Sequence, residues 1–286
     1  MTRHRLRNRV KGAWDAGTPR VLAALIAAYV FVWLVGAVAF GRIGVVRFDP
    51  AVGLVVPFAL VFGPLGVAAA GGAVLLRDVA VGGLGVETPI LVAGHLVSGY
   101  IAVRFRGLFG ETTRRWTGIV RSPRHLASYL GVAVVASSAG AAVVGWGNEL
   151  LAVAPFFLAA VTAGQYALGT ILVGLPALLF FDRVVGRPDV EREAQPPSTV
   201  ATAAIGVVSV GWLAAGIVGS LGFRNGARLP VEVFERNGIG FVSPLVDPAL
   251  FGPGGVRAQA VVGAVAVVLL VVTLWATDDG SGRAAE

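Results

Sequence analysis

The sequence predicts an all-α integral membrane protein with about eight transmembrane helices and both termini in the cytoplasm. Its composition and the placement of its charges carry this prediction. Of the 286 residues, 56% are hydrophobic and only 14% are charged, and the mean hydropathy is +0.80. Soluble domains have about a quarter of their residues charged, so this balance excludes a soluble class. The chain has no cysteine, which excludes disulfides, thiolate metal sites and thiol nucleophiles.

The positions of the arginines indicate how the chain is oriented in a membrane and argue against nucleic-acid binding. The formal net charge is +7, Lys11 is the only lysine, and the arginines flank apolar segments. Positive charge stays on the cytoplasmic side of a membrane. The basic tail of residues 1–20 is therefore predicted inside, and residues 21–40 run outward as the first span. This run is about 20 residues long, beyond the apolar core of a signal peptide, which predicts an anchor.

A break at Gly63-Pro64 sets the number of spans. If residues 51–76 were one helix, the segment of residues 104–124 would lie outside, although it holds six arginines. The residue before a proline is pushed out of the helical conformation. The break predicts a short second span, residues 51–62, and a third, residues 65–81. Twelve residues rise only about 18 Å as a helix, less than the roughly 30 Å hydrocarbon core, so the second span must be tilted or shielded.

The remaining apolar runs complete the predicted architecture. Pro155 and Pro176 are expected to trim or kink the sixth span, and a turn at residues 145–149 lies outside. Five further spans are predicted: residues 89–103, 126–144, 150–181, 200–221 and 256–275. The predicted parts are a six-helix bundle (21–183), a cytoplasmic linker (184–199), a two-helix extension (200–275) with an external loop (222–255), and a cytoplasmic tail (276–286).

His95 is the main candidate for chemistry within the spans, because ionisable groups are costly in a bilayer. It lies about six residues into the fourth predicted span. One interpretation is a neutral imidazole hydrogen-bonded to a backbone carbonyl across a helix interface. The other is a ligand contact in an outward-facing pocket. His4 and His125 lie in the tail and at a span end, so the sequence predicts no metal site.

Two pairs of polar residues are further ligand candidates. Trp146 and Asn148, beside Glu149, lie at the outer end of the fifth span. They form either an interfacial aromatic with a solvated turn or the lip of a cavity for a polar aromatic ligand. Gln165 and Tyr166 lie in the middle of the sixth span. Lipid satisfies neither side chain, so both are expected to face protein or a cavity.

The sequence gives little support for catalysis or a pump. It contains no HExxH, no Gly-x-Ser-x-Gly and no phosphate loop. Ser137 and Ser138 lie in an Ala/Gly-rich helix, where serine usually serves packing. Arg77 and Asp78 are adjacent and do not share a helix face, so a solvated helix end is expected there. We therefore predict a non-enzyme without a cofactor, placed in the cell membrane as a multi-pass protein in contact with the lipid bilayer.

Several features together resemble a known family. They are the short second span, the Gly/Ala-rich third span opening at Gly63-Pro64, the Thr88-Pro89 start of the fourth, and the arginine-rich loop that follows. Over about residues 21–183 the chain resembles the S component, the substrate-binding subunit, of energy-coupling factor vitamin transporters. The last two spans lie outside this resemblance.

The resemblance implies a function and its residues. A small, vitamin-like molecule would bind from outside, under the loop of residues 41–50, and a separate coupling subunit with ATPases would supply energy. It makes His95, Trp146, Asn148, Gln165 and Tyr166 ligand candidates. A histidine where thiamine-binding members place an acid argues against thiamine. The Ala-x-x-x-Ala docking pattern of the family is matched by two pairs, Ala23 with Ala27 and Ala24 with Ala28.

Two other functions stay open at this point. A non-catalytic membrane sensor or scaffold would share the same overall composition. A self-contained secondary transporter is the second alternative, although no internal repeat is visible in the sequence.

Overall fold

The structure, a computed structural model, describes residues 18–40, 48–109, 118–151, 153–184, 198–224 and 255–279. Every regular element in these ranges is a helix. Parts of several predicted segments lie outside the described residues: the basic tail, the loop of residues 41–50, the arginine-rich loop, the linker, the external loop and the C-terminal tail.

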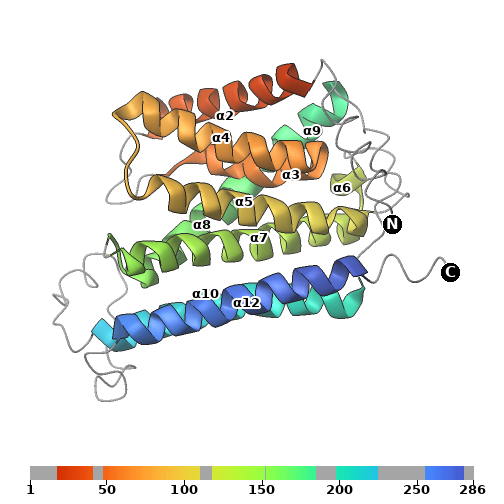
Figure 1. Ribbon diagram of the computed structural model, residues 1–286. Coiled ribbons are helices and arrows are strands. Elements are labelled where there is room, and N and C mark those ends of the chain that lie inside the picture. The colour runs from red at the N-terminus through yellow and green to blue at the C-terminus, as the bar shows by residue number, and fades with distance from the viewer. Residues whose placement is uncertain are drawn as a thin grey trace, which may run out of the picture.

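The helices lie side by side and run largely along one direction (Figure 1). α2 and α4 form one edge, α10 and α12 the other, and α5 and α7 lie between them. The long elements are α2 (Thr18–Phe40), α3 (Val55–Phe62), α4 (Pro64–Val81), α5 (Thr88–Arg104), α7 (Pro123–Leu150), α8 (Ala159–Gly169), α9 (Leu175–Val184), α10 (Thr199–Arg224) and α12 (Gly255–Asp279). The short ones are η1 (Pro50–Leu54), η2 (Arg106–Phe109), α6 (Gly118–Arg121), η3 (Phe156–Leu158) and the π-helical η4 (Thr170–Gly174).

The helices support the prediction of a helical membrane protein. Five stretches of the described chain are long and apolar enough to cross a membrane: Thr18–Ala39, Pro64–Val81, Pro123–Leu150, Phe156–Phe181 and Thr199–Leu221. Pro50–Phe62 and Gln259–Trp275 are shorter apolar helices. Large apolar side chains face outward along these helices, as expected of a surface that meets lipid. The number of crossings and the side of each terminus stay predictions.

The break at Gly63-Pro64 is present. α3 ends at Phe62, and Gly63 adopts a φ of +60° that favours glycine, before Pro64 opens α4. The two helices then fold back on each other at close range. A Cβ on Gly66 would lie 2.0 Å from the Phe58 carbonyl oxygen, so the backbones touch. Residues 51–76 are therefore two helices joined by a tight turn.

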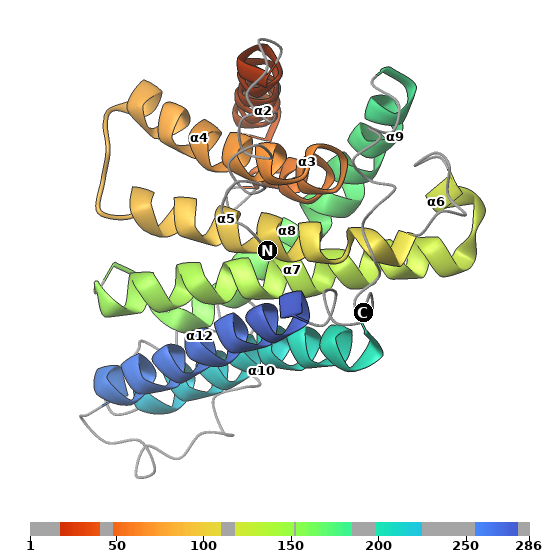
Figure 2. The ribbon, with the colours of Figure 1, turned by 45° about the vertical axis from the view of Figure 1, so that its right-hand side comes forward.

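Two ends of the bundle are defined by their charged residues. At the arginine end, Arg104 donates to the Leu274 carbonyl (3.1 Å) and Arg106 to the Val61 carbonyl (3.3 Å). At the aspartate end, Asp49 and Asp78 lie near the starts of η1 and α5. The last turn of α12 and the first turn of α2 both lie at the right in Figure 1. The turned view in Figure 2 keeps α10 and α12 against α7. Successive helices thus alternate in direction between the two ends.

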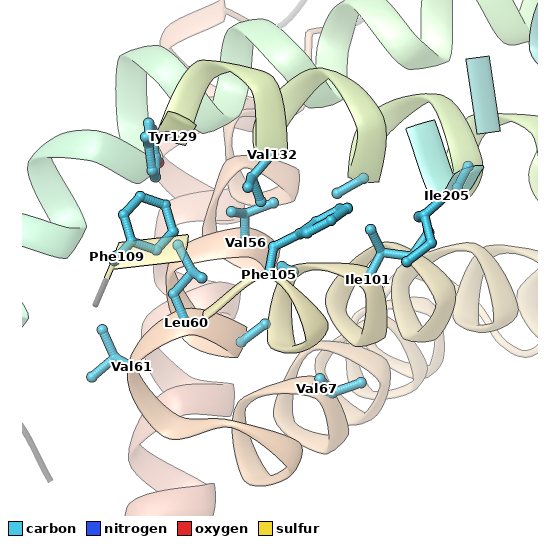
Figure 3. Close-up of a cluster of buried hydrophobic side chains, with 14 of the residues drawn as sticks. Val56, Leu60, Val61, Val67, Ile101, Phe105, Phe109, Tyr129, Val132 and Ile205 are labelled. Carbon is cyan, nitrogen blue, oxygen red and sulfur yellow. The ribbon is translucent and has the colours of Figure 1, made fainter. Parts of the chain in front are cut away.

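One of the three apolar core clusters among the described residues reaches the last two helices. Figure 3 shows part of it. Val56 and Leu60 of α3 lie there with Phe105, the residue after α5, and with Val132 of α7 and Ile205 of α10. Leu270 and Leu274 of α12 belong to the same cluster. α10 and α12 therefore share the core of the preceding helices.

The prediction of a turn at residues 145–149 is wrong. These residues form the last turns of α7, which continues to Leu150. The glycines here fit against neighbours: a Cβ on Gly145 would lie 2.6 Å from Ala159 Cβ. The expected effect of the prolines is observed, since Pro155 precedes η3 and Pro176 follows the π-helical η4 in α9.

Candidate functional site

A pocket of about 470 Å³ lies at the aspartate end, between the last turns of α2, the start of η1 and the last turn of α4. We call it the Arg77 pocket. Its lining residues are Trp33, Gly36, Ala37, Phe48, Asp49, Pro50, Arg77, Asp78 and Val81. The pocket thus combines aromatic and small apolar side chains with three charged groups.

Close packing of α2 on η1 forms one wall. A Cβ on Gly36 would lie 2.3 Å from Pro50 Cγ, so only glycine allows this contact. Asp49 precedes the proline and caps η1, because its Oδ1 accepts from the Ala51 N–H (2.9 Å). The other carboxylate oxygen of Asp49, Oδ2, accepts a hydrogen bond from Arg77 in the pocket.

Arg77 joins two carboxylates in this network. Its Nε and Nη2 donate to Asp78 Oδ1 (2.9 and 2.8 Å), and its Nη1 donates to Asp49 Oδ2 (3.2 Å). The Thr88 hydroxyl donates to Asp78 Oδ2 (2.6 Å). The side chains of Arg77, Asp49 and Asp78 are only 14%, 19% and 13% exposed.

The expectation of a solvated helix end at these residues is wrong. The arginine side chain donates to the carboxylate of its neighbour in sequence, while α2 packs on α4 and Asp49, the residue before η1, accepts from Arg77. Hydrogen bonds to charged groups are the stronger kind, and here they offset the cost of burial.

His95 lies deeper, in a buried cluster of three side chains from three helices. The Tyr29 hydroxyl of α2 is 2.9 Å from His95 Nε2, and the Tyr166 hydroxyl of α8 is 3.0 Å from Nδ1. Nδ1 also lies 2.8 Å from the Leu91 carbonyl oxygen. A carbonyl only accepts, so in a neutral ring Nδ1 carries the proton and Nε2 accepts from Tyr29. The carbonyl therefore belongs to the same helix as His95, whereas a carbonyl across a helix interface was expected; the partners across the interface are the two tyrosine hydroxyls.

Replacing His95 with phenylalanine is expected to destabilise the protein by about 2–4 kcal/mol, because the Tyr29 and Tyr166 hydroxyls lose their buried partner. The triple variant His95→Phe, Tyr29→Phe, Tyr166→Phe removes every polar group of the cluster and is expected to recover most of this loss. Thermal unfolding of the purified variants measures both. A triple variant as unstable as His95→Phe would show that ring packing, not hydrogen bonding, holds the cluster.

Trp146 and Asn148 do not line the Arg77 pocket. Trp146 stacks edge-on against Trp212 at 6.1 Å between ring centroids. A Cβ on Gly263 would lie 2.1 Å from its Nε1, so the indole packs directly on α12. Glu149, 7% exposed, accepts from the Phe156 N–H and from the Ser220 hydroxyl (3.2 Å). This end of α7 is an interface with η3, α10 and α12.

The other predicted residues take separate positions. Gln165 is half-buried and does not line the pocket, whereas Tyr166 joins His95. On α2, Ala23, Ala24 and Ala27 are exposed, and Ala28 packs partly into the core. Of the five ligand candidates the structure brings together only His95 and Tyr166.

Sequence reasoning missed Tyr29, Trp33 and Asp49. A signal existed for Asp49, because Asp-Pro before an apolar run is a typical helix start. In the part of the chain that the structure describes, no group of three or more acidic or histidine side chains could hold a metal ion. Comparisons with protein-family models, curated proteins and solved structures find no match to this chain. Its function therefore has to follow from its own residues.

Proposed function

We propose that this protein captures a small molecule from outside the cell in the Arg77 pocket, as the substrate-binding subunit of an uptake system. The observation that supports this is a charged and largely buried network lining a 470 Å³ pocket at one end of a bundle of apolar helices. Charged groups placed among membrane helices are costly and usually serve binding or transport. Small-molecule sites span roughly 300–1,000 Å³ and combine apolar walls with a few polar groups.

The distribution of charge supports an outward-facing pocket. Arg104, Arg106, Arg121 and Arg124 follow α5 or flank the start of α7, at the end opposite to Asp49 and Asp78. The positive-inside rule places the arginine end in the cytoplasm. The pocket then faces the outside, where a ligand for uptake arrives.

Energy for delivery would come from partners. The sequence holds no phosphate-binding loop, and the resemblance to S components implies a coupling subunit with ATPases. The exposed alanines of α2 would let a partner helix approach closely.

Small molecules that co-purify with the protein in mild detergent test this proposal. Mass spectrometry of extracts should find a compound with the wild type that is absent from Ala37→Phe, a change that fills the pocket. Ala39→Phe, an exposed position on the same helix, is the matched control and should retain the compound.

The alternatives predict other results. No bound compound in any variant, and no thermal shift with a panel of vitamins, would favour a membrane sensor or scaffold. Uptake by the protein alone in liposomes under an ion gradient would favour a self-contained secondary transporter.

A further inference from the structure

We propose that the start of α7 binds the headgroup of an anionic phospholipid, with Arg121 and Arg124 on the phosphate and an exposed apolar face of α7 against one acyl chain. Figure 2 shows α6 and the start of α7 at the right-hand margin of the bundle. This site lies at the arginine end. It is independent of the Arg77 pocket and of the function proposed for that pocket.

The arginines at the start of α7 differ from those inside the bundle. Arg77 binds two carboxylates, and Arg104 and Arg106 bind backbone carbonyls. Arg121 and Arg124 are exposed, and within the described residues neither guanidinium has a hydrogen bond or an ion pair. The fold does not use their positive charge, which is therefore available to an anion outside the protein.

The two arginines lie where α7 enters the membrane. Pro123–Leu150 is long and apolar enough to cross a membrane, so Arg121 precedes this stretch by two residues and Arg124 stands in its first turn. Lipid phosphates lie at this level, and long arginine side chains reach them from the end of a span. Because the two residues are three positions apart, their Cα atoms are at most about 11 Å from each other. Both side chains can therefore reach one phosphate.

An apolar face of α7 continues along the helix from Arg124. Ala127, Gly131 and Val134 are exposed, and their spacing of three and four residues places them on the same face as Arg124. A Cβ on Gly131 would meet nothing within 4 Å, so this point of the face is open. A cation followed by an apolar strip matches a lipid, whose charged headgroup is joined to apolar chains. A nucleic acid or an acidic protein would not match the apolar part.

Charge favours an anionic headgroup over a zwitterionic one. A guanidinium presents parallel N–H donors that match phosphate oxygens. Phosphatidylglycerol carries one negative charge on its phosphate, whereas phosphatidylcholine adds a cation that would lie beside the two arginines. Each basic residue near an anionic lipid surface contributes about fivefold in affinity, so the two arginines give a preference of roughly 25-fold at most.

Native mass spectrometry of the full-length protein tests the site. The protein in a non-ionic detergent is titrated with an equimolar mixture of phosphatidylglycerol and phosphatidylcholine that carry the same acyl chains. The ratio of the two bound lipids is then measured. The wild type should bind phosphatidylglycerol at least about tenfold more tightly, and Arg121→Gln with Arg124→Gln should reduce this preference to about twofold or less.

Two further variants make the test specific. Ala127→Glu leaves both arginines in place and puts a carboxylate one turn from Arg124, so it should also reduce the preference, by about fivefold. Leu84→Glu with Val86→Glu lowers the net charge by as much as the double glutamine variant does. These two positions are exposed and lie between α4 and α5, at the other end of the bundle. This control should retain the preference.

Any of three results would overturn the inference. The first is a wild type that binds both lipids equally. The second is a preference that persists in a folded Ala127→Glu protein or in the folded double glutamine variant. The third is a preference that disappears in the control with Leu84→Glu and Val86→Glu, because net charge and not this site would then select the lipid. None of these results bears on the Arg77 pocket, which the co-purification experiment tests with other variants.

Discussion

Replacing Arg77 with leucine is expected to lower the free energy of unfolding by about 3 kcal/mol, because two partly buried carboxylates lose their shared cation. Asp49 and Asp78 are 19% and 13% exposed, and both accept hydrogen bonds from Arg77. Without the guanidinium, both carboxylates lose these hydrogen bonds and draw in water, and the ends of α2, η1 and α4 separate. Thermal and denaturant unfolding of the purified variant in detergent measures the loss.

Two further variants of the same protein serve as controls for this prediction. Arg183→Leu removes an exposed arginine near the end of α9 and is expected to change stability by less than about 0.5 kcal/mol. The triple variant Arg77→Met, Asp49→Asn, Asp78→Asn removes every charge of the network and should recover much of the stability, since the penalty comes from unpaired charge. If Arg77→Leu and Arg183→Leu were equally stable, the network would be too hydrated to matter.

Replacing Gly53 with leucine is expected to cost about 3 kcal/mol or more and to prevent accumulation of folded protein. A Cβ on Gly53 would lie 2.1 Å from the Gly169 carbonyl oxygen, and one on Gly174 would lie 2.4 Å from the Gly53 oxygen. Three glycines thus let η1 touch the backbone on both sides of the π-helical η4. No side-chain rotation relieves a clash between a Cβ and a backbone.

Gly131→Leu is the matched control, because a Cβ at this helical glycine of α7 meets nothing within 4 Å. We expect its yield and elution on size-exclusion chromatography to match the wild type. A Gly53→Leu protein that also eluted as a monodisperse peak at wild-type yield would show that η1 can move away from η4 at little cost.

The helix pattern could be predicted from the sequence wherever a local signal marked it. Gly63-Pro64 carries a glycine for an unusual backbone angle and a proline for a helix start, and α3 and α4 meet there. The long apolar runs likewise predicted helices, because in lipid every backbone group must be bonded within its own segment. The sequence has no such signal at the end of α7, and the turn predicted at residues 145–149 is part of that helix.

The candidate site depended on pairings that the sequence does not mark. Asp49 and Arg77 are 28 residues apart, and Tyr29 and His95 are 66 apart. Tyr29 stands in a run of apolar and aromatic residues, where a tyrosine is indistinguishable from core packing. The packing of α2 on α4 and η1, with Tyr29 reaching His95 of α5, brings these groups together.

Trp146 shows how later helices determine the surroundings of a residue. Its polar neighbours in the sequence allowed two interpretations, an interfacial aromatic with a solvated turn and the lip of a cavity. Its actual partners, Trp212 and Gly263, come from helices that follow much later in the chain. A glycine more than a hundred residues away gives no local sign that an indole will lie on it.

The contacts at the arginine end have a consequence for biosynthesis. Arg106 binds the Val61 carbonyl in the last turn of α3, which is the negative end of that helix dipole, and Arg104 binds the Leu274 carbonyl within α12. Two arginines of the segment that the positive-inside rule predicts to be cytoplasmic thus also bind helix carbonyls. The α12 acceptor is made 170 residues after its arginine, so this contact forms only once the C-terminal helix has been synthesised. Moving these arginines to other positions would therefore remove two contacts to helix carbonyls as well as a predicted topology signal.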